Sequence, residues 1–159
     1  MLTHFDEIIE KVLEHEGGYV NDPDDLGGET NWGITKRFYP DVDIKNLTKE
    51  DAKQIYYDDY WLKNRVNKIP PKLKYIYFDM CINMGKRTAV KILQRASNNK
   101  NSKDIEVDGG LGANTFYAIQ DVELERVRAY RVKYYVDLVN KKPEQEKFYF
   151  GWFRRSLQV

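Results

Sequence analysis

Near the start of the chain, apolar residues recur at the spacing of an amphipathic helix, and the run stops at two glycines. The apolar face is formed by Phe5, Ile8, Ile9, Val12 and Leu13. Gly17 and Gly18 follow, and glycine disfavours continuation of a helix. Residues 19–34 are then rich in Asn, Asp, Pro and Gly, which favour turns. We therefore predict a helix followed by a short irregular β-hairpin or folded loop.

Most of the remaining chain has helical patterns. A helix over 48–62 is predicted to start at Thr48, with Asp51 at the N3 position of a capping box. Another helix starts at the proline pair 70–71 and ends at Gly85, and a short one follows over 87–96. A long helix is predicted over 114–140. The fold class is mainly α, a helical bundle with a small β-hairpin insertion after the first helix.

Size and charge exclude several functional classes. A chain of 159 residues suits one domain with a substantial core. The 26 Lys+Arg against 25 Asp+Glu give a net charge of +1, whereas nucleic-acid binding needs a basic excess. No segment approaches the roughly 20 apolar residues of a membrane-spanning helix, and the acidic start is unlike a signal peptide. We expect a soluble monomer, made in the cytoplasm without an export signal, that binds no nucleic acid and does not insert into membranes.

Several residues that can bind metals or cofactors in other proteins do not form a recognisable site. Cys81 is the single cysteine and lies on an apolar helix face, which predicts a buried, inert thiol. The two histidines show no metal-ligand spacing, and the glycines at 109–112 lack the Lys of a phosphate-binding loop. We expect no metal and no cofactor. The long helix carries alternating charges, which predicts a solvated, ion-paired face of Glu123, Glu125, Arg126, Arg128, Arg131 and Lys133.

Glu16 is the strongest candidate for chemistry. At about 100° per residue it returns to within about 20° of the direction of Phe5, so it continues the apolar stripe. A carboxylate there loses hydration, which favours the protonated form that a general acid needs. The glycines that follow would let a ligand approach closely. From position alone, the alternative is a solvated residue in the last helical turn.

A hairpin folded back over the helix end would bring a second carboxylate and a hydroxyl opposite Glu16. Asp25 and Thr30 are the first candidates. Two carboxyl groups about 5 to 5.5 Å apart, or about 6.5 to 9.5 Å apart, are the pair that retaining or inverting glycoside hydrolysis uses. The alternatives for the second carboxylate are Asp22, Asp24 and Glu29. Each of them also fits an Asx-turn or a solvated loop acid.

The order of these residues resembles a known family. The Glu-Gly-Gly-Tyr motif at 16–19, then Val-Asn-Asp-Pro at 20–23 and the segment 25–35, is similar to the signature of the glycoside hydrolase family 108 lysozymes. Residues 60–61, 78–85 and 93–96 resemble the helical part of that family. The resemblance implies an α+β lysozyme-like fold.

The second half of the chain resembles the predicted peptidoglycan-binding region that commonly follows. The turn at 107–115 and residues 150–152 carry this similarity, although Ala113 stands where proline is frequent. The polar stretch 97–103 is the candidate boundary. We expect a catalytic region at 1–96 and a helical peptidoglycan-binding region at 97–159, packed into one compact unit.

The resemblance implies a glycosidase of the lysozyme class. Such an N-acetylmuramidase cleaves the β-1,4 bond between N-acetylmuramic acid and N-acetylglucosamine in peptidoglycan glycan strands, in phage or prophage lysis as an endolysin, or in wall remodelling. The motif glutamate, Glu16, is implied to be essential. Phage-type lysozymes of related fold add an acid nine residues on and then a Thr. Asp25 fits that spacing, and Thr30 falls one residue short.

Three residues are candidates for contacts with the substrate. Tyr19 and Trp32 flank the site and are expected to bind substrate by stacking on sugars. Asn83 resembles a family position near the cleft, with helix capping as its alternative.

The alternative functions are a non-catalytic peptidoglycan-binding or secretion-accessory protein (a secretion activator) and a lytic transglycosylase. Without a signal peptide, the enzyme would reach the wall through a holin or a dedicated release route.

Overall fold

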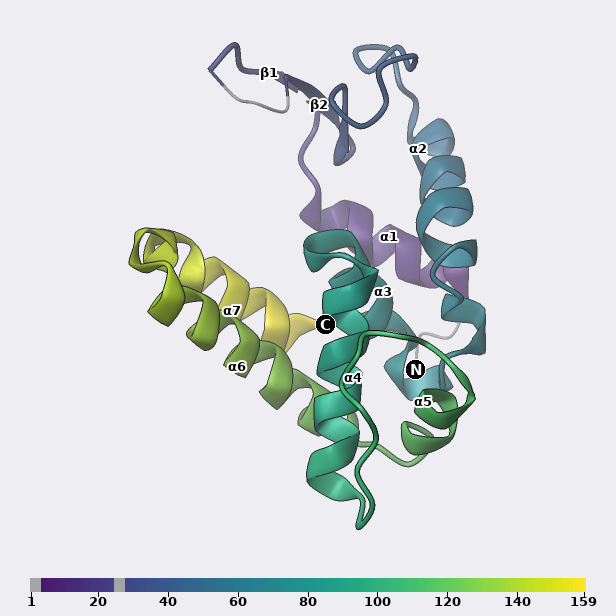
Figure 1. Cartoon of the computed structure of the whole chain (residues 1–159). Coiled ribbons are helices and arrows are strands. Elements are labelled where there is room, and N and C mark those ends of the chain that lie inside the picture. Colours follow the sequence, from purple (N-terminus) through teal and green to yellow (C-terminus); the bar gives the residue numbers. More distant parts are fainter. Residues whose placement is uncertain (1–3, 25–27) are drawn as a thin grey trace. The chain divides into compact units, whose positions relative to one another are not determined.

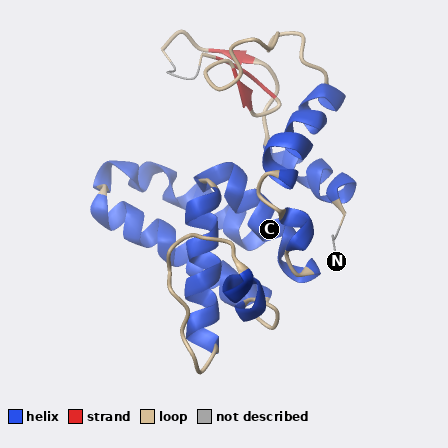
Figure 2. Ribbon diagram, turned by 45° about the vertical axis from the view of Figure 1, so that its right-hand side comes forward, coloured by secondary structure: helices blue, strands red, loops and turns tan. Residues whose placement is uncertain are grey.

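The computed structural model describes residues 4–24 and 28–159. The chain divides into two compact units, an N-terminal unit that ends at Lys63 and a C-terminal unit that begins at Asn64. Helices dominate, and the strands form one small antiparallel sheet (Figure 2). These features confirm the predicted mainly α class with a β insertion after the first helix.

The first helix of the N-terminal unit, α1 (Phe5–His15), forms as its apolar pattern predicts. Ile8, Ile9 and Val12 are fully buried on its inner face. The helix ends one residue before Glu16, whose backbone is extended, with φ −90° and ψ 132°. The expectation that Glu16 continues the helical stripe is therefore wrong in detail. Glu16 is the C-cap, and its N–H donates to Leu13 O at 3.2 Å.

The segment after the glycine pair forms three short strands, one more than the predicted hairpin. They are β1 (Val20–Asn21), β2 (Glu29–Asn31) and β3 (Ile34–Thr35), in the order β1-β2-β3. Figure 1 labels β1 and β2. Between β2 and β3, Trp32 and Gly33 have φ of 53° and 77°. Positive φ at both central residues is what a two-residue type I′ hairpin turn requires.

The second helical segment, predicted over 48–62, consists of two parts. α2 (Lys49–Tyr56) begins with the expected capping box of Thr48 and Asp51, and the π-helix η1 (Tyr57–Leu62) continues it. Phe5 packs edge-on against Tyr57 and Trp61, with ring centroids 5.0 Å and 5.4 Å away. These aromatic contacts tie the start of α1 to η1.

The C-terminal unit starts with two short 3-10 turns and a pair of helices. The turns are η2 (Val66–Lys68) and η3 (Pro71–Leu73), and the helices are α3 (Lys74–Met84) and α4 (Lys86–Lys100). Gly85 separates α3 from α4 as predicted, with φ 84°. Cys81 on α3 is buried as predicted, and burial raises the pKa of its thiol to about 12, which disfavours the reactive thiolate.

The single helix predicted over 114–140 is wrong. The chain forms α5 (Ala113–Ala118), breaks, and resumes as α6 (Leu124–Lys141), followed by η4 (Pro143–Phe148) and α7 (Tyr149–Gln158). Ile119 and Val122 are both fully buried, and the N–H of Val122 donates to Ile119 O. A tight turn thus lets both apolar side chains enter the core, and the continuous helical pattern does not reveal it.

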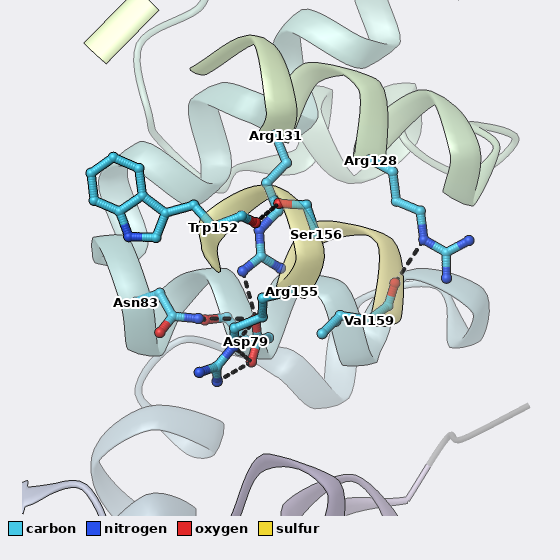
Figure 3. A network of polar contacts seen from close by, with 8 residues as sticks. All are labelled: Asp79, Asn83, Arg128, Arg131, Trp152, Arg155, Ser156 and Val159. Carbon is cyan, nitrogen blue, oxygen red and sulfur yellow. Dashed lines mark hydrogen bonds and ion pairs between the residues drawn. The ribbon is translucent and has the colours of Figure 1, made fainter. Parts of the chain in front are cut away.

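A buried ionic cluster joins three helices of this unit (Figure 3). Asp79 on α3 accepts from Arg131 on α6 at 2.7 Å and from Arg155 on α7 at 2.7 Å. Asp79 and Arg131 are fully buried, so the predicted solvated face is wrong for Arg131. A buried charge is tolerated only when paired, and Asp79 supplies that partner.

Among residues 4–24 and 28–159, no helix combines the length and the apolarity that crossing a membrane requires.

Candidate active site

The carboxylate of Glu16 lies against the β2–β3 turn of the N-terminal unit. A Cβ atom built on Gly33 would lie only 2.9 Å from Glu16 Oε2 and 3.1 Å from its Cδ. It would also collide with the hydroxyl of Tyr56. A glycine at position 33 therefore meets two requirements, the left-handed backbone of the turn and the close approach of the Glu16 carboxylate.

Tyr56, near the end of α2, holds the same turn from the other side. Its hydroxyl donates to the carbonyl oxygen of Trp32 at 3.0 Å, and the residue is 1% exposed. Trp32 has a left-handed backbone, which costs a bulky residue on the order of 1–3 kcal/mol. One hydrogen bond offsets about 1 kcal/mol of such a cost. Strain of this kind at a non-glycine residue is a mark of functional sites.

Tyr60 on η1 is the second tyrosine near Glu16. Burial raises the pKa of Tyr60, and the negative charges of Asp59 and Glu16 act in the same direction. Its ring centroid lies 5.4 Å from that of Tyr56. Tyr39 hydrogen bonds with Tyr60 and donates to Asp59 Oδ2 at 2.9 Å. Two phenols from adjoining helical segments, Tyr56 and Tyr60, therefore lie near the carboxylate.

The sheet holds the other predicted catalytic residues that the structure describes. Thr30 is half-buried in the central strand, paired with Val20 on one side and Thr35 on the other. Asp25, the first candidate for the second carboxylate, lies outside the described residues. The catalytic roles of Asp25 and Thr30 remain predictions.

The alternatives for the second carboxylate have local partners. Asp22 Oδ1 accepts the backbone N–H of Asp24 at 2.9 Å, which is the Asx-turn contact that its alternative reading expects. Glu29 Oε1 accepts the hydroxyl of Tyr19 at 3.1 Å. Tyr19 is 39% exposed, so part of its side chain is accessible to a ligand.

The two other predicted substrate-binding residues differ in setting. Trp32 has a half-buried side chain, and its backbone belongs to the turn that contacts Glu16. Asn83 belongs to the C-terminal unit, where its Nδ2 donates to the carbonyl oxygen and to Oδ2 of Asp79, both at 2.9 Å (Figure 3). Substrate binding by Asn83 remains a prediction.

Sequence reasoning missed Gly33 and Tyr56 as parts of the site. Tyr56 lies within the helix predicted over 48–62, and its hydroxyl contact bridges residues 24 positions apart. The only local signal was the Trp-Gly pair at 32–33, which is not the Asn-Gly or Asp-Gly pair typical of a type I′ turn.

Chemically, the arrangement is a half-buried carboxylate bordered by two phenolic rings and a glycine turn. A carboxyl group in this position is a candidate general acid toward a bound ether oxygen. Groups of three or more His, Cys, Asp or Glu side chains that could hold a metal ion do not occur in the described part of the chain.

Comparison with known proteins matches residues 9–85 to the family described as Glycosyl hydrolase 108. This part of the chain belongs to the glycosyl hydrolase 108 family. Residues 88–157 match a second family, described as Predicted Peptidoglycan domain. The glycosyl hydrolase 108 segment includes most of α1, the sheet, α2 and α3, and the two matches meet near Gly85.

A solved structure described as that of Brucella abortus SagA is similar over 97% of this chain and 90% of that chain. The sequence identity is 28% and the TM-score 0.76. Comparison with curated proteins gives no match. The similarity confirms the lysozyme-like, mainly α fold, and the two families make the chain a glycosidase with a peptidoglycan-related function.

The division into 1–96 and 97–159 stays a prediction. α4 runs unbroken from Lys86 to Lys100, and Ala96 and Ser97 on either side of the predicted boundary are fully buried.

Proposed function

We propose that the protein is an N-acetylmuramidase that cleaves the β-1,4 bond between N-acetylmuramic acid and N-acetylglucosamine, with Glu16 as general acid. The observation that supports this most is the contact of the Glu16 carboxylate with the Gly33 turn and its closeness to the Tyr56 hydroxyl. Membership of residues 9–85 in the glycosyl hydrolase 108 family supports the same reaction class.

In the proposed reaction, Glu16 donates its proton to the glycosidic oxygen as the bond from that oxygen to C1 of the muramic acid ring breaks. Positive charge develops on C1 and the ring oxygen. Water then adds its hydroxide to C1, and its proton restores the acid. Asp25 and Thr30 would stabilise the charged ring or position the water, and Tyr19 and Trp32 would bind sugar rings.

The biological setting that we propose is degradation of the bacterial wall, in phage or prophage lysis or in wall remodelling. The Predicted Peptidoglycan domain match at 88–157 supports the wall as the place of action.

The direct test is Glu16→Gln, measured as the rate at which purified peptidoglycan loses turbidity. Removal of a general acid should lower this rate by about 10²- to 10⁴-fold with the circular dichroism spectrum unchanged. Glu14→Gln is the matched control, because Glu14 is an exposed acid in the last turn of α1, just before Glu16, and its ion pair with Lys11 is 3.6 Å long. Clearing at the parent rate by Glu16→Gln would reject Glu16 as the acid.

A further inference from the structure

A cavity of about 700 Å³ lies in the C-terminal unit, lined by side chains of α4 and α6. We call it the basic groove and define it by Lys91, Arg95, Tyr130, Tyr134, Lys141 and Lys142. Its volume is within the range of about 300–1,000 Å³ that small-molecule sites occupy.

Regular helical spacing builds the groove. Lys91 and Arg95 are four residues apart on α4, and Tyr130 and Tyr134 are four apart on α6, so each pair shares one helix face. Other faces of the two helices are buried, through Val90 and Leu93 on α4 and through Arg131 and Tyr135 on α6. All groove residues but Lys142, which directly follows α6, are therefore held on two packed helices.

Positive charge in the groove is poorly compensated. Asp137 is the one acid among the lining residues, and it already pairs with Lys133 at 2.8 Å. Among residues 4–24 and 28–159, no carboxylate forms an ion pair with Lys91, Arg95, Lys141 or Lys142. Such a concentration of unpaired cations in a chain of net charge +1 favours an anionic ligand.

The tyrosines add hydrogen-bonding and packing capacity. Tyr134 is half-buried, and burial raises its pKa, so its hydroxyl remains a neutral donor. A phenol offers a flat apolar face and one polar tip, which suits a ligand that has both methyl groups and carboxylates.

We propose that the basic groove binds the acidic stem peptides of peptidoglycan. This rests on the proposed function, which makes peptidoglycan the target. The lactyl carboxylate of each peptide-bearing muramic acid is consumed in its amide bond, so the negative charge of peptidoglycan is on the stem-peptide carboxylates. Arginine and lysine pair with carboxylates through charge-assisted hydrogen bonds, and Tyr130 and Tyr134 pack against the short peptide.

The test is co-sedimentation of the full chain with purified, insoluble peptidoglycan, in a Glu16→Gln background so that cleavage does not alter the pellet. Lys91→Glu with Arg95→Glu should raise the dissociation constant about tenfold, as expected when two exposed ion pairs are lost and replaced by repulsion. Lys68→Glu with Lys72→Glu is the matched control. It makes the same change in net charge within the same unit and should stay within about twofold of the parent.

Chemical treatment of the peptidoglycan identifies the ligand. Carbodiimide amidation neutralises the carboxylates and should weaken parent binding to the level of the groove variant. Hydrofluoric acid removes attached phosphate polymers and should leave binding unchanged. Loss of binding after hydrofluoric acid alone would assign the groove to phosphates and overturn the stem-peptide proposal.

A second pair of substitutions guards against a folding defect. Lys141→Glu with Lys142→Glu, at the exposed end of α6, should weaken binding in the same way while the thermal melt matches the parent. If both groove variants bind as the control does, the proposal is wrong. Because binding is measured without turnover, that outcome differs from failure of the proposed hydrolysis, which would appear as intact peptidoglycan after digestion with the parent protein.

Discussion

At the residue scale, the residues that surround the Glu16 carboxylate lie outside the sequence motif that identifies it. The Glu-Gly-Gly-Tyr motif identified Glu16, but the neighbours of its carboxylate come from the β2–β3 turn and from α2. Helical periodicity placed Glu16 on the apolar stripe, whereas its backbone has already left the helix. Local patterns thus identify the candidate catalytic residue but not its neighbours, because Gly33 and Tyr56 meet Glu16 only after the chain folds.

Gly33→Ala tests the importance of this contact. The added methyl group meets both a positive φ of 77° and the atoms of Glu16 and Tyr56. We expect a loss of roughly 2–4 kcal/mol in the free energy of unfolding, from left-handed backbone strain plus overpacking. The rate of peptidoglycan clearing should fall as well, because the Glu16 carboxylate is displaced.

Gly28→Ala separates the two causes. Gly28 also has a positive φ, 68°, but a Cβ there meets no atom within 4 Å. Urea denaturation should show a loss of roughly 1–2 kcal/mol for this control, from backbone strain alone. Equal losses for the two variants would mean that Gly33 serves only the turn.

At the scale of elements, the predictions succeeded where a local signal exists. The capping box of Thr48 and Asp51 starts α2, and Gly85 ends α3, because caps and glycines act on their own neighbourhood. The break between α5 and α6 was missed, since Ile119 and Val122 fit a helical pattern and are buried by a turn. The same pattern could not reveal that Arg131 points inward to Asp79.

The start of α6 gives a pH-dependent prediction. Glu123 accepts from Arg126 at 2.8 Å and from Lys100 at 3.2 Å. The hydrogen bond from Arg126, then that of its own backbone and that of Lys100, lower the pKa of Glu123 from 4.5 to about 2. A lowered folded-state pKa means that the stabilisation is complete above about pH 4.5 and is lost as pH falls toward 2.

Glu123→Gln should therefore lower the urea midpoint at pH 7, and its difference from the parent should vanish as pH falls from 4.5 toward 2. Glu125→Gln removes an exposed acid from the same helix turn and should leave the midpoint near that of the parent. A Glu123→Gln difference that stays constant down to pH 2 would show that the ion pairs do not produce it.

At the scale of the whole molecule, two family segments divide the chemistry. The glycosyl hydrolase 108 segment contains Glu16 and its turn, and the Predicted Peptidoglycan domain match contains the basic groove. Net charge describes the second segment poorly, because a balanced total of +1 conceals the local excess of cations. Fold class and reaction class could thus be predicted from sequence, while the groove required the packing of α4 against α6.

The product of digestion tests the central claim most directly. Purified peptidoglycan is treated with the parent protein or with Glu16→Gln, the soluble fragments are reduced with borohydride, and their ends are identified by mass spectrometry. The proposed muramidase predicts fragments with reduced N-acetylmuramic acid at the new end for the parent, and none for Glu16→Gln. Fragments ending in N-acetylglucosamine, or in a 1,6-anhydro muramic acid as a lytic transglycosylase would leave, would contradict it.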